Sequence, residues 1–233
     1  LGDVYKRQVL IFQENMYQWQ MQSNKDRFGD WFIMDIGSRQ PDSNLTDHIY
    51  IEQPVKVSRS VNVLNDDWQS TGFYVGSFSS EFLAQSHIKL DEGRQPENSG
   101  EIAMDWNTLL TLGYNGEIGE SINLKYCDNN SIGNKEKRNT KTYTLVGIYR
   151  NYTNIWNNGK QIPSAVVVNS ELSQFNYDIR SVFLYPIKAS IKTDDYKAVF
   201  DSIKEKTSKS YTYNSGVYDL SLIHISEPTR HLR

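Results

Sequence analysis

The sequence predicts an α+β fold with a mixed β-sheet core and a few short helices. Short apolar runs typical of strands recur along the chain, and no regular strand–helix–strand alternation joins them into a parallel sheet. The 15 tyrosines, 5 tryptophans and a hydrophobic share of 38% supply enough apolar surface for a folded core. No apolar run approaches the roughly 20 residues that span a bilayer, which means only that no span lies within these residues.

The first element is a predicted helix over 9–28. Apolar residues, among them Leu10, Met16 and Met21, recur there at helical spacing with polar residues between them. Gly29 follows as a stop signal. Residues 30–36 then read as a strand that is apolar on both faces.

The second group of elements is a series of strands. Apolar and polar residues alternate over 48–63, and Pro54 interrupts them, which predicts two strands or one broken edge strand. Residues 71–78 predict a further strand. After it, 93–100 has the composition of a turn, and 101–104 predicts a short strand.

One short helix is expected over 106–112. Asp105 is a good N-cap for it, and Gly113 ends it. Trp106 and Trp31 lie inside apolar runs, so we expect both side chains in the core.

The rest of the chain is predicted to contain further strands and one more helix. Further strands are expected over 119–126, 141–149, 162–168 and 182–191, the last broken by Pro186. The polar segment 127–140 predicts a mobile hairpin tip. An amphipathic helix is expected over 194–206. The pattern allows two lobes, a core around 30–170 and a smaller lobe near 175–213.

The two ends of the chain have the form of translated sequencing adapter. Residues 1–8 correspond to the codons CTC GGA GAT GTG TAT AAG AGA CAG, whose reverse complement translates as the Leu-Ser-Leu-Ile-His-Ile-Ser-Glu found at 220–227. A genuine basic tail is the alternative. We therefore expect 1–8 and 220–233 to be adapter and the native domain to lie within 9–219. Without the adapter the net charge moves from −3 to −5.

Composition and motifs argue against several classes of function. Mild acidity is unlike a nucleic-acid surface, so no nucleic-acid partner is expected. A single cysteine, Cys127, allows no intrachain disulfide framework. His48 and His87 lack metal-type spacing, and no Walker loop or Gly-x-Ser-x-Gly elbow occurs. We expect no enzyme, no metal and no cofactor; a catalytic triad built on either histidine is left as a minor alternative.

Four phrases stand in order over about sixty residues of the chain. They are Leu-Asp-Glu-Gly-Arg-Gln-Pro at 90–96, Glu-Ile-Ala at 101–103, Gly-Glu-Ser-Ile-Asn-Leu at 119–124 and Tyr-Thr-Leu-Val-Gly-Ile at 143–148. In this combination the chain resembles the extracytoplasmic core domain of FtsX/MacB-like ABC-transporter permeases. Glu120 replaces the commoner Asp of that pattern. The motif positions carried over, in structural roles, are Gly93, Arg94, Pro96, Glu101, Ile102, Gly113, Gly119 and Gly147.

The resemblance implies a place and a role for the domain. In the family it lies between two transmembrane helices, so the helix 9–29 would be a membrane-proximal stalk and 30–219 the core domain on the extracytoplasmic face of the cell membrane. A separate cytoplasmic ATPase subunit would drive motion through the stalk, to export or extract a substrate or to activate an envelope partner. A homodimer or a second permease, and a peptide, lipoprotein or envelope partner, fit the same resemblance.

Physical reasoning assigns the motif a structural role. Gly93 can take a positive φ in a turn, and Arg94 can reach a carboxylate such as that of Glu101 through its forked guanidinium. The alternative for Arg94 is a contact with a ligand or partner.

Two aromatic residues in the polar loop 150–159, Tyr152 and Trp156, are candidates for a partner contact, with anchoring of the loop into the core as the alternative. For the whole chain, the alternative to a permease domain is a soluble secreted or lipoprotein binding module for glycans or peptides.

Overall fold

The computed structural model describes residues 2–128, 131–150, 152, 156, 162–175 and 179–226, with the backbone alone for 223–226. The strands are β1 (Ile33–Ser38), β2 (Val55–Leu64), β3 (Ser70–Ser77), β4 (Leu90–Gly93), β5 (Glu101–Asp105), β6 (Ser121–Cys127), β7 (Asn139–Tyr149), β8 (Ala165–Val166), β9 (Arg180–Tyr185) and β10 (Thr212–Tyr213). The α-helices are α1 (Gly2–Phe28), α2 (Ser43–Thr46), α3 (Ser80–Ser86), α4 (Trp106–Thr111), α5 (Asn169–Gln174), α6 (Tyr196–Lys206) and α7 (Ser215–Ser226). Two 3₁₀ turns, η2 (Lys135–Lys137) and η5 (Thr193–Asp195), complete the described elements.

Six of the strands close on themselves into a small barrel. Around it, β2 pairs with β3, β3 with β8, β8 with β5, β5 with β7, β7 with β6, and β6 returns to β2. The β3–β8 and β5–β7 pairs are parallel and the others antiparallel, so the sheet is mixed. Closure satisfies the backbone groups that an open sheet would leave along its edges. We call the barrel, with β4, α3, α4 and α5, the head.

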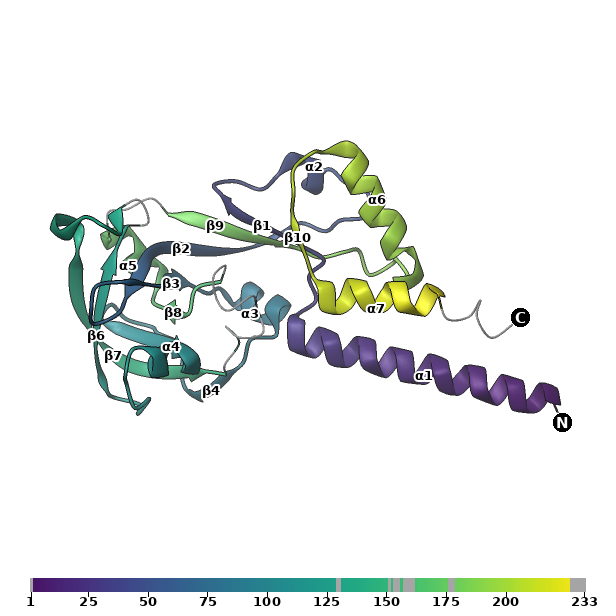
Figure 1. Cartoon of the computed structure of the whole chain (residues 1–233), viewed down its shortest axis with the longest axis horizontal. Helices are drawn as coiled ribbons and strands as arrows, with labels where there is room; N and C mark the ends of the chain where they lie inside the picture. The colour runs from purple at the N-terminus through teal and green to yellow at the C-terminus, as the bar shows by residue number, and fades with distance from the viewer. Residues whose placement is uncertain are drawn as a thin grey trace.

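The remaining strands extend the sheet away from the head. Strand β2 also pairs with β9, β9 with β1, and β1 with β10, all antiparallel. Helices α6 and α7 and part of α1 pack against this extension (Figure 1). Its buried apolar cluster takes residues from both ends of the chain, including Tyr17 and Phe32 from the first part and Tyr185 and Val199 from the last. We call this region the base.

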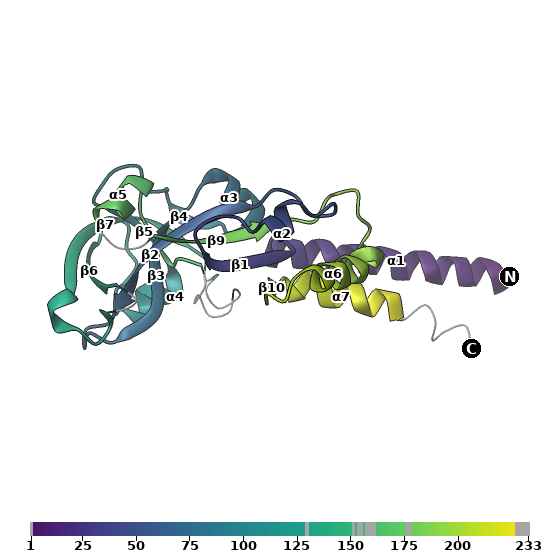
Figure 2. The same cartoon turned by 90° about the horizontal axis from the view of Figure 1, so that it is seen from above.

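Helices α1 and α7 lie side by side at the base and point the same way out of the molecule. α1 runs toward the sheet and α7 runs away from it, so the outer ends of the two helices lie at one end of the molecule, far from the head (Figure 1). The view from above shows the same arrangement (Figure 2). Within the described residues, none of the helices is long and apolar enough to cross a membrane.

The predicted α+β class and most of the predicted elements are confirmed. The helix before Gly29 begins earlier than expected, at Gly2. Pro54 separates β2 from a single bridge between Ile51 and Ile187, as a broken strand requires. The strand expected over 162–168 is only the two residues of β8. Trp31 is buried as predicted, but Trp106 is 38% exposed, so its placement in the core was wrong.

Candidate functional site

The motif turn joins β4 to β5 and is closed by one bidentate ion pair. Arg94 donates from Nη1 to Oε2 of Glu101 at 2.8 Å and from Nη2 to Oε1 at 2.6 Å. The same carboxylate accepts the backbone N–H groups of Glu97 and Asn98 at 2.9 and 3.1 Å. The predicted contact between Arg94 and Glu101 is therefore confirmed, and it is made inside the turn.

The electrostatics of the turn favour the charged forms of both partners. Hydrogen bonds from Arg94, and then from the Glu97 backbone N–H, hold the pKa of Glu101 far below its ordinary value. The hydrogen bonds to Glu101 raise the pKa of Arg94 in turn. The guanidinium also donates to the Gln95 carbonyl at 3.0 Å. These hydrogen bonds of the guanidinium are therefore all made to residues of the turn.

Two motif glycines face each other where the turn meets the barrel. Gly93 has a φ of +75° and pairs with Gly147 of β7. A Cβ on Gly93 would lie 2.1 Å from the Val146 carbonyl oxygen, and one on Gly147 would lie 2.2 Å from the Arg94 carbonyl oxygen. Neither position therefore accepts a side chain. Because both residues lack a Cβ atom, the two strands come close enough for the Arg94 N–H to donate to the Val146 carbonyl at 2.8 Å.

The other motif positions lie in the turn, in the barrel, and in the segment between α4 and β6. Ile102 is fully buried in the barrel, and Pro96 is partly buried within the turn. Gly113 follows α4 with a φ of +81°. Gly119 has a φ of +93°, and its N–H donates to the Leu145 carbonyl at 2.8 Å.

The aromatic loop after β7 is anchored in the core. Tyr152 is 3% exposed and Trp156 is 6% exposed. The Tyr152 N–H donates to Asp105 at 2.9 Å, and the ring of Trp156 lies 5.3 Å from that of Trp31. The interpretation of these two side chains as an exposed aromatic contact is therefore wrong, and the alternative of an anchored loop holds. The other loop residues, 151, 153–155 and 157–159, lie outside the described part.

The structure adds a junction, where α1 and α7 meet the sheet, that the sequence did not predict. Asn214, which is 2% exposed, donates from Nδ2 to the carbonyls of Gly29 and Trp31 at 3.1 and 2.9 Å. Asn24 of α1 donates to the Gly216 carbonyl of α7 at 2.5 Å. These bonds tie the inner end of each helix to the other helix and to the segment that leads into β1.

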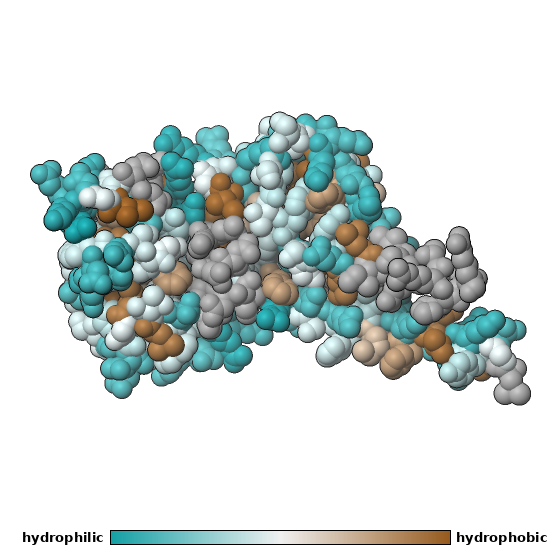
Figure 3. All heavy atoms as spheres, in the orientation of Figure 1, coloured by the Kyte–Doolittle hydropathy of each residue, from teal (hydrophilic) through white to brown (hydrophobic). Residues whose placement is uncertain are grey.

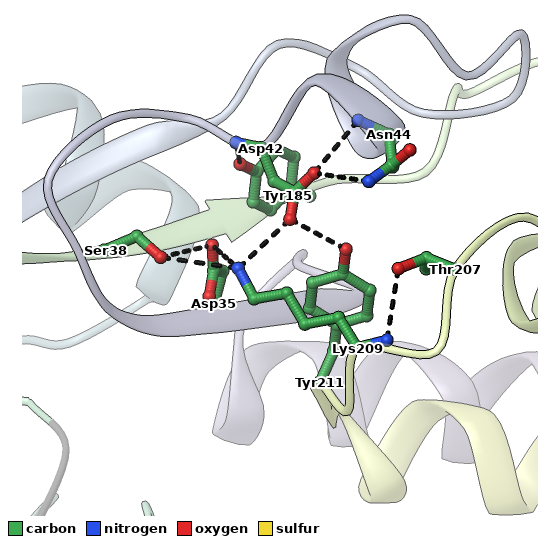
Figure 4. Close-up of polar contacts among 8 residues, drawn as sticks. All are labelled: Asp35, Ser38, Asp42, Asn44, Tyr185, Thr207, Lys209 and Tyr211. Atoms are coloured by element: carbon green, nitrogen blue, oxygen red, sulfur yellow. Dashed lines mark hydrogen bonds and ion pairs between the residues drawn. The ribbon is translucent and has the colours of Figure 1, made fainter.

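A second ionic cluster lies beside this junction, in the base (Figure 4). Lys209 donates from Nζ to Oδ2 of Asp35 at 2.8 Å and to Oδ2 of Asp42 at 3.0 Å. The hydroxyl of Tyr211 donates to Asp42 at 2.9 Å, and the Asp42 N–H donates to the hydroxyl of Tyr185 at 2.8 Å. We call these five residues the Lys209 cluster; it joins β1, the loop before α2, β9 and the segment before β10.

The ionisation of the Lys209 cluster fits a structural role, in which fixed charges hold four segments together. Burial lowers the pKa of Lys209, but the hydrogen bonds and charges of Asp35 and Asp42 together outweigh it and raise that pKa. Burial and the Asp42 hydrogen bond raise the pKa of Tyr211. Burial raises the pKa of Tyr185 to about 12. Although burial acts in the opposite direction, hydrogen bonds from Lys209 and from the Asn44 N–H lower the pKa of Asp42. The lysine is thus held charged and the tyrosines neutral, which makes none of them a ready nucleophile or base.

The two histidines considered above, His48 and His87, do not complete a catalytic triad with described residues. The His48 ring lies 3.1 Å from Ser202 Oγ, but its other nitrogen faces the Tyr50 N–H instead of a carboxylate. The His87 ring lies 2.8 Å from Asp30 and 3.7 Å from Asp26, so it faces two acids. Among the described residues no group of His, Cys, Asp and Glu is placed to hold a metal ion.

The signal that could have located the Lys209 cluster is the placement of Asp35 inside an apolar strand. A buried carboxylate requires a partner, and the structure leaves Asp35 only 3% exposed. The sequence does not show which cation pairs with Asp35, because Lys209 is 174 residues away.

No family model matches the chain, and no curated protein matches it. Among solved structures, the periplasmic region of MacB from Actinobacillus actinomycetemcomitans matches with a TM-score of 0.41 and 10% identity, over 85% of this chain and 96% of that one. The extracellular domain of the noncanonic ABC-type transporter YknZ from Gram-positive bacteria matches with a TM-score of 0.36 and 12% identity, over 78% and 98%. Likeness at this level carries no argument about function.

Proposed function

We propose that the chain is the extracytoplasmic domain of an FtsX/MacB-like ABC-transporter permease. In this proposal it lies at the outer face of the cell membrane and moves when a cytoplasmic ATPase subunit binds ATP. The motion exports or extracts a substrate or activates an envelope partner. A homodimer or a second permease completes the membrane part. The ATP chemistry belongs to the ATPase, and the domain itself is not catalytic.

The observation that carries the proposal is the paired arrangement of α1 and α7. A domain inserted between two membrane spans must return both of its ends to one surface, and α1 enters the base beside α7, which leaves it on the side away from the head (Figure 1). The order of the four sequence phrases over 90–148 supports the same proposal independently.

The junction gives this arrangement a physical means of passing motion to the sheet. The Asn214 bonds to Gly29 and Trp31, and the Asn24 bond to Gly216, join the inner ends of α1 and α7 to each other and to β1. A displacement of the helix pair would therefore move the base and, through β2 and β9, the head. Coupling of this kind needs two discrete arrangements that ATP binding biases.

We further propose that residues 1–8 and 220–233 are adapter, so that native residues replace the first turns of α1 and the outer part of α7. The genomic DNA on both sides of 9–219 tests both proposals. An apolar span of about 20 residues on each side, with an ATPase gene nearby, is the expected result. A signal peptide upstream and a stop codon soon after residue 219 would contradict it and would favour the secreted or lipoprotein binding module.

A labelling experiment on the complete gene tests the location. Ser190 is exposed in the loop before η5, whereas the only native cysteine of the chain, Cys127, is fully buried. We expect a Ser190→Cys variant to react with a membrane-impermeant maleimide in intact spheroplasts more strongly than the parent protein, whose reaction sets the background. Labelling of the variant only after lysis would place the domain in the cytoplasm and overturn the proposal.

A further inference from the structure

The head exposes three large apolar side chains next to one another. Trp106, Leu110 and Ile118 are 38%, 55% and 42% exposed. Trp106 and Leu110 lie one turn apart on α4 and so share a face of that helix. The Trp106 ring lies against Gly116, where an added Cβ would be 2.4 Å from ring atom Cζ3. Ile118 follows two residues after Gly116 in the same loop, and we call Trp106, Leu110 and Ile118 together the α4 patch.

The α4 patch is not an accident of an incompletely buried helix. The opposite face of α4 is buried without it, since Thr108 and Leu109 are fully buried and Asp105 caps the helix through the Asn107 N–H at 3.1 Å. The space-filling view shows apolar surface over α4 with hydrophilic surface around it (Figure 3). Exposed tryptophan and aliphatic side chains with a polar rim are typical of sites that bind another protein.

The charges around the α4 patch are negative. Glu92 and Glu117 are exposed and make no ion pair with any residue in the described part of the chain, whereas the Glu120 carboxylate accepts backbone N–H groups of its own loop. Glu117 precedes Ile118 directly, and Ile118 lies over Gly93, the neighbour of Glu92. Two of the nearby cations are already paired within the head, since Arg94 is bound to Glu101 and Arg150 to Asp91 at 3.1 Å, which leaves Lys89 as an exposed cation before β4.

We propose that the α4 patch binds a cationic amphipathic peptide segment of a partner protein. Its apolar side chains would cover Trp106, Leu110 and Ile118, and its lysine or arginine side chains would meet Glu92 and Glu117. Charge decides against two other occupants. A second copy docked through the same patch would set these carboxylates against each other. An anionic lipid surface would be repelled by them. The proposal does not depend on a transporter role for the chain.

Direct binding of a defined peptide tests the proposal. The probe is a fluorescent peptide of lysine and leucine spaced to form an amphipathic helix, titrated with the full 233-residue chain and followed by anisotropy. A sister peptide with glutamate in place of lysine is the charge control. We expect the lysine peptide to bind and the glutamate peptide to bind at least about tenfold more weakly.

Variants then locate the binding to the patch. Leu110→Ser should weaken binding by about tenfold, since one largely exposed leucine loses its contact area. The double charge reversal Glu92→Lys with Glu117→Lys should abolish the preference for the lysine peptide. Ile49→Ser is the matched control, because Ile49 is an apolar residue of the base with 64% exposure, and it should leave binding unchanged. Thermal unfolding of each variant shows whether it is folded.

Three outcomes would overturn the proposal. Equal binding of the two peptides would remove the role of charge. An equal loss in Ile49→Ser and Leu110→Ser, or no loss in either, would place the binding elsewhere. Self-association of the chain, or its binding to anionic vesicles, that disappears in Leu110→Ser would assign the patch to a second copy or to lipid.

Discussion

The motif turn of the head and the Lys209 cluster of the base are both built on a cation shared with carboxylate oxygens, but they differ in how far apart their partners lie in the sequence. Arg94 and Glu101 are 7 residues apart, whereas Lys209 lies 174 and 167 residues from Asp35 and Asp42. They also differ in burial, with side-chain exposure of 16% for Glu101 and 3% for Asp35.

This difference indicates that the turn and the Lys209 cluster stabilise the protein at different ranges. The ion pair of the turn joins residues of one local segment, so its loss should be felt locally. The Lys209 cluster closes a loop of nearly the whole chain around the base, where α1 and α7 are attached. Removing its cation should therefore weaken the global fold more than opening the ion pair of the turn.

The largest expected effect tests the backbone of the turn apart from its charges. Gly93→Ala should lower the free energy of unfolding by about 3 kcal/mol, because a positive φ strains alanine and its Cβ would collide with the Val146 carbonyl. Gly100→Ala is the matched variant, with a φ of +86° but nothing within 4 Å of the added Cβ, and should cost about 1 kcal/mol. Urea unfolding measures both. Equal losses would show that crowding between the two strands is unimportant.

The next effect tests the base. Lys209→Ala should lower the free energy of unfolding by about 2 kcal/mol, because it leaves Asp35 and Asp42 without their cation, and the partial exposure of the lysine reduces the loss below that of a fully buried pair. Lys206→Ala removes an exposed lysine that ends α6 and should change stability by less than about 0.5 kcal/mol. Urea unfolding of both variants measures the two losses in free energy of unfolding, and equal losses would contradict a special role for Lys209.

A neutralised variant separates charge from packing in that result. Combining Asp35→Asn and Asp42→Asn with Lys209→Met removes all three charges and should recover most of the stability lost in Lys209→Ala. If the combined variant is as unstable as Lys209→Ala, the lysine acts through its packing and the ionic brace is the wrong description.

The contrast between the two regions also explains what the sequence could predict. The helix end before Gly29, the cap at Asp105 and the Arg94–Glu101 pair all depend on neighbours within a few residues, and all three are confirmed. Closure of the barrel requires β6 to pair with both β7 and β2, and no local pattern records a pairing over that distance. The Lys209 cluster was missed for the same reason.

Burial of individual aromatic residues was the least predictable feature. Trp106 lies in an apolar run but faces solvent, because Thr108 and Leu109 supply the buried face of its short helix. Tyr152 and Trp156 lie in a polar loop but are buried, because the loop returns to Asp105 and Trp31. In both cases tertiary packing overrides the local composition.

The smallest expected effect concerns acid. The folded pKa of Glu101 is far below its ordinary value of 4.5, so the folded state binds fewer protons there than the unfolded state. The stabilisation is therefore complete well above pH 4.5 and is lost as the pH falls from there toward the lowered folded value. In Glu101→Gln that part of the acid loss should be absent, and the plot of stability against pH should be flatter below 4.5, although the variant is less stable at neutral pH.

Two further variants make this acid test a comparison of the head with the base. Asp42 also has a lowered pKa, but it starts from 3.8, so Asp42→Asn should flatten the plot only at lower pH than Glu101→Gln does. Glu92→Gln removes a carboxylate that forms no ion pair with a described residue, and it serves as the control. Urea unfolding from neutral pH down to about pH 3 measures all of them. If Glu92→Gln flattened the plot as much as Glu101→Gln, general charge repulsion would account for the acid loss and the ion pair of the turn would not.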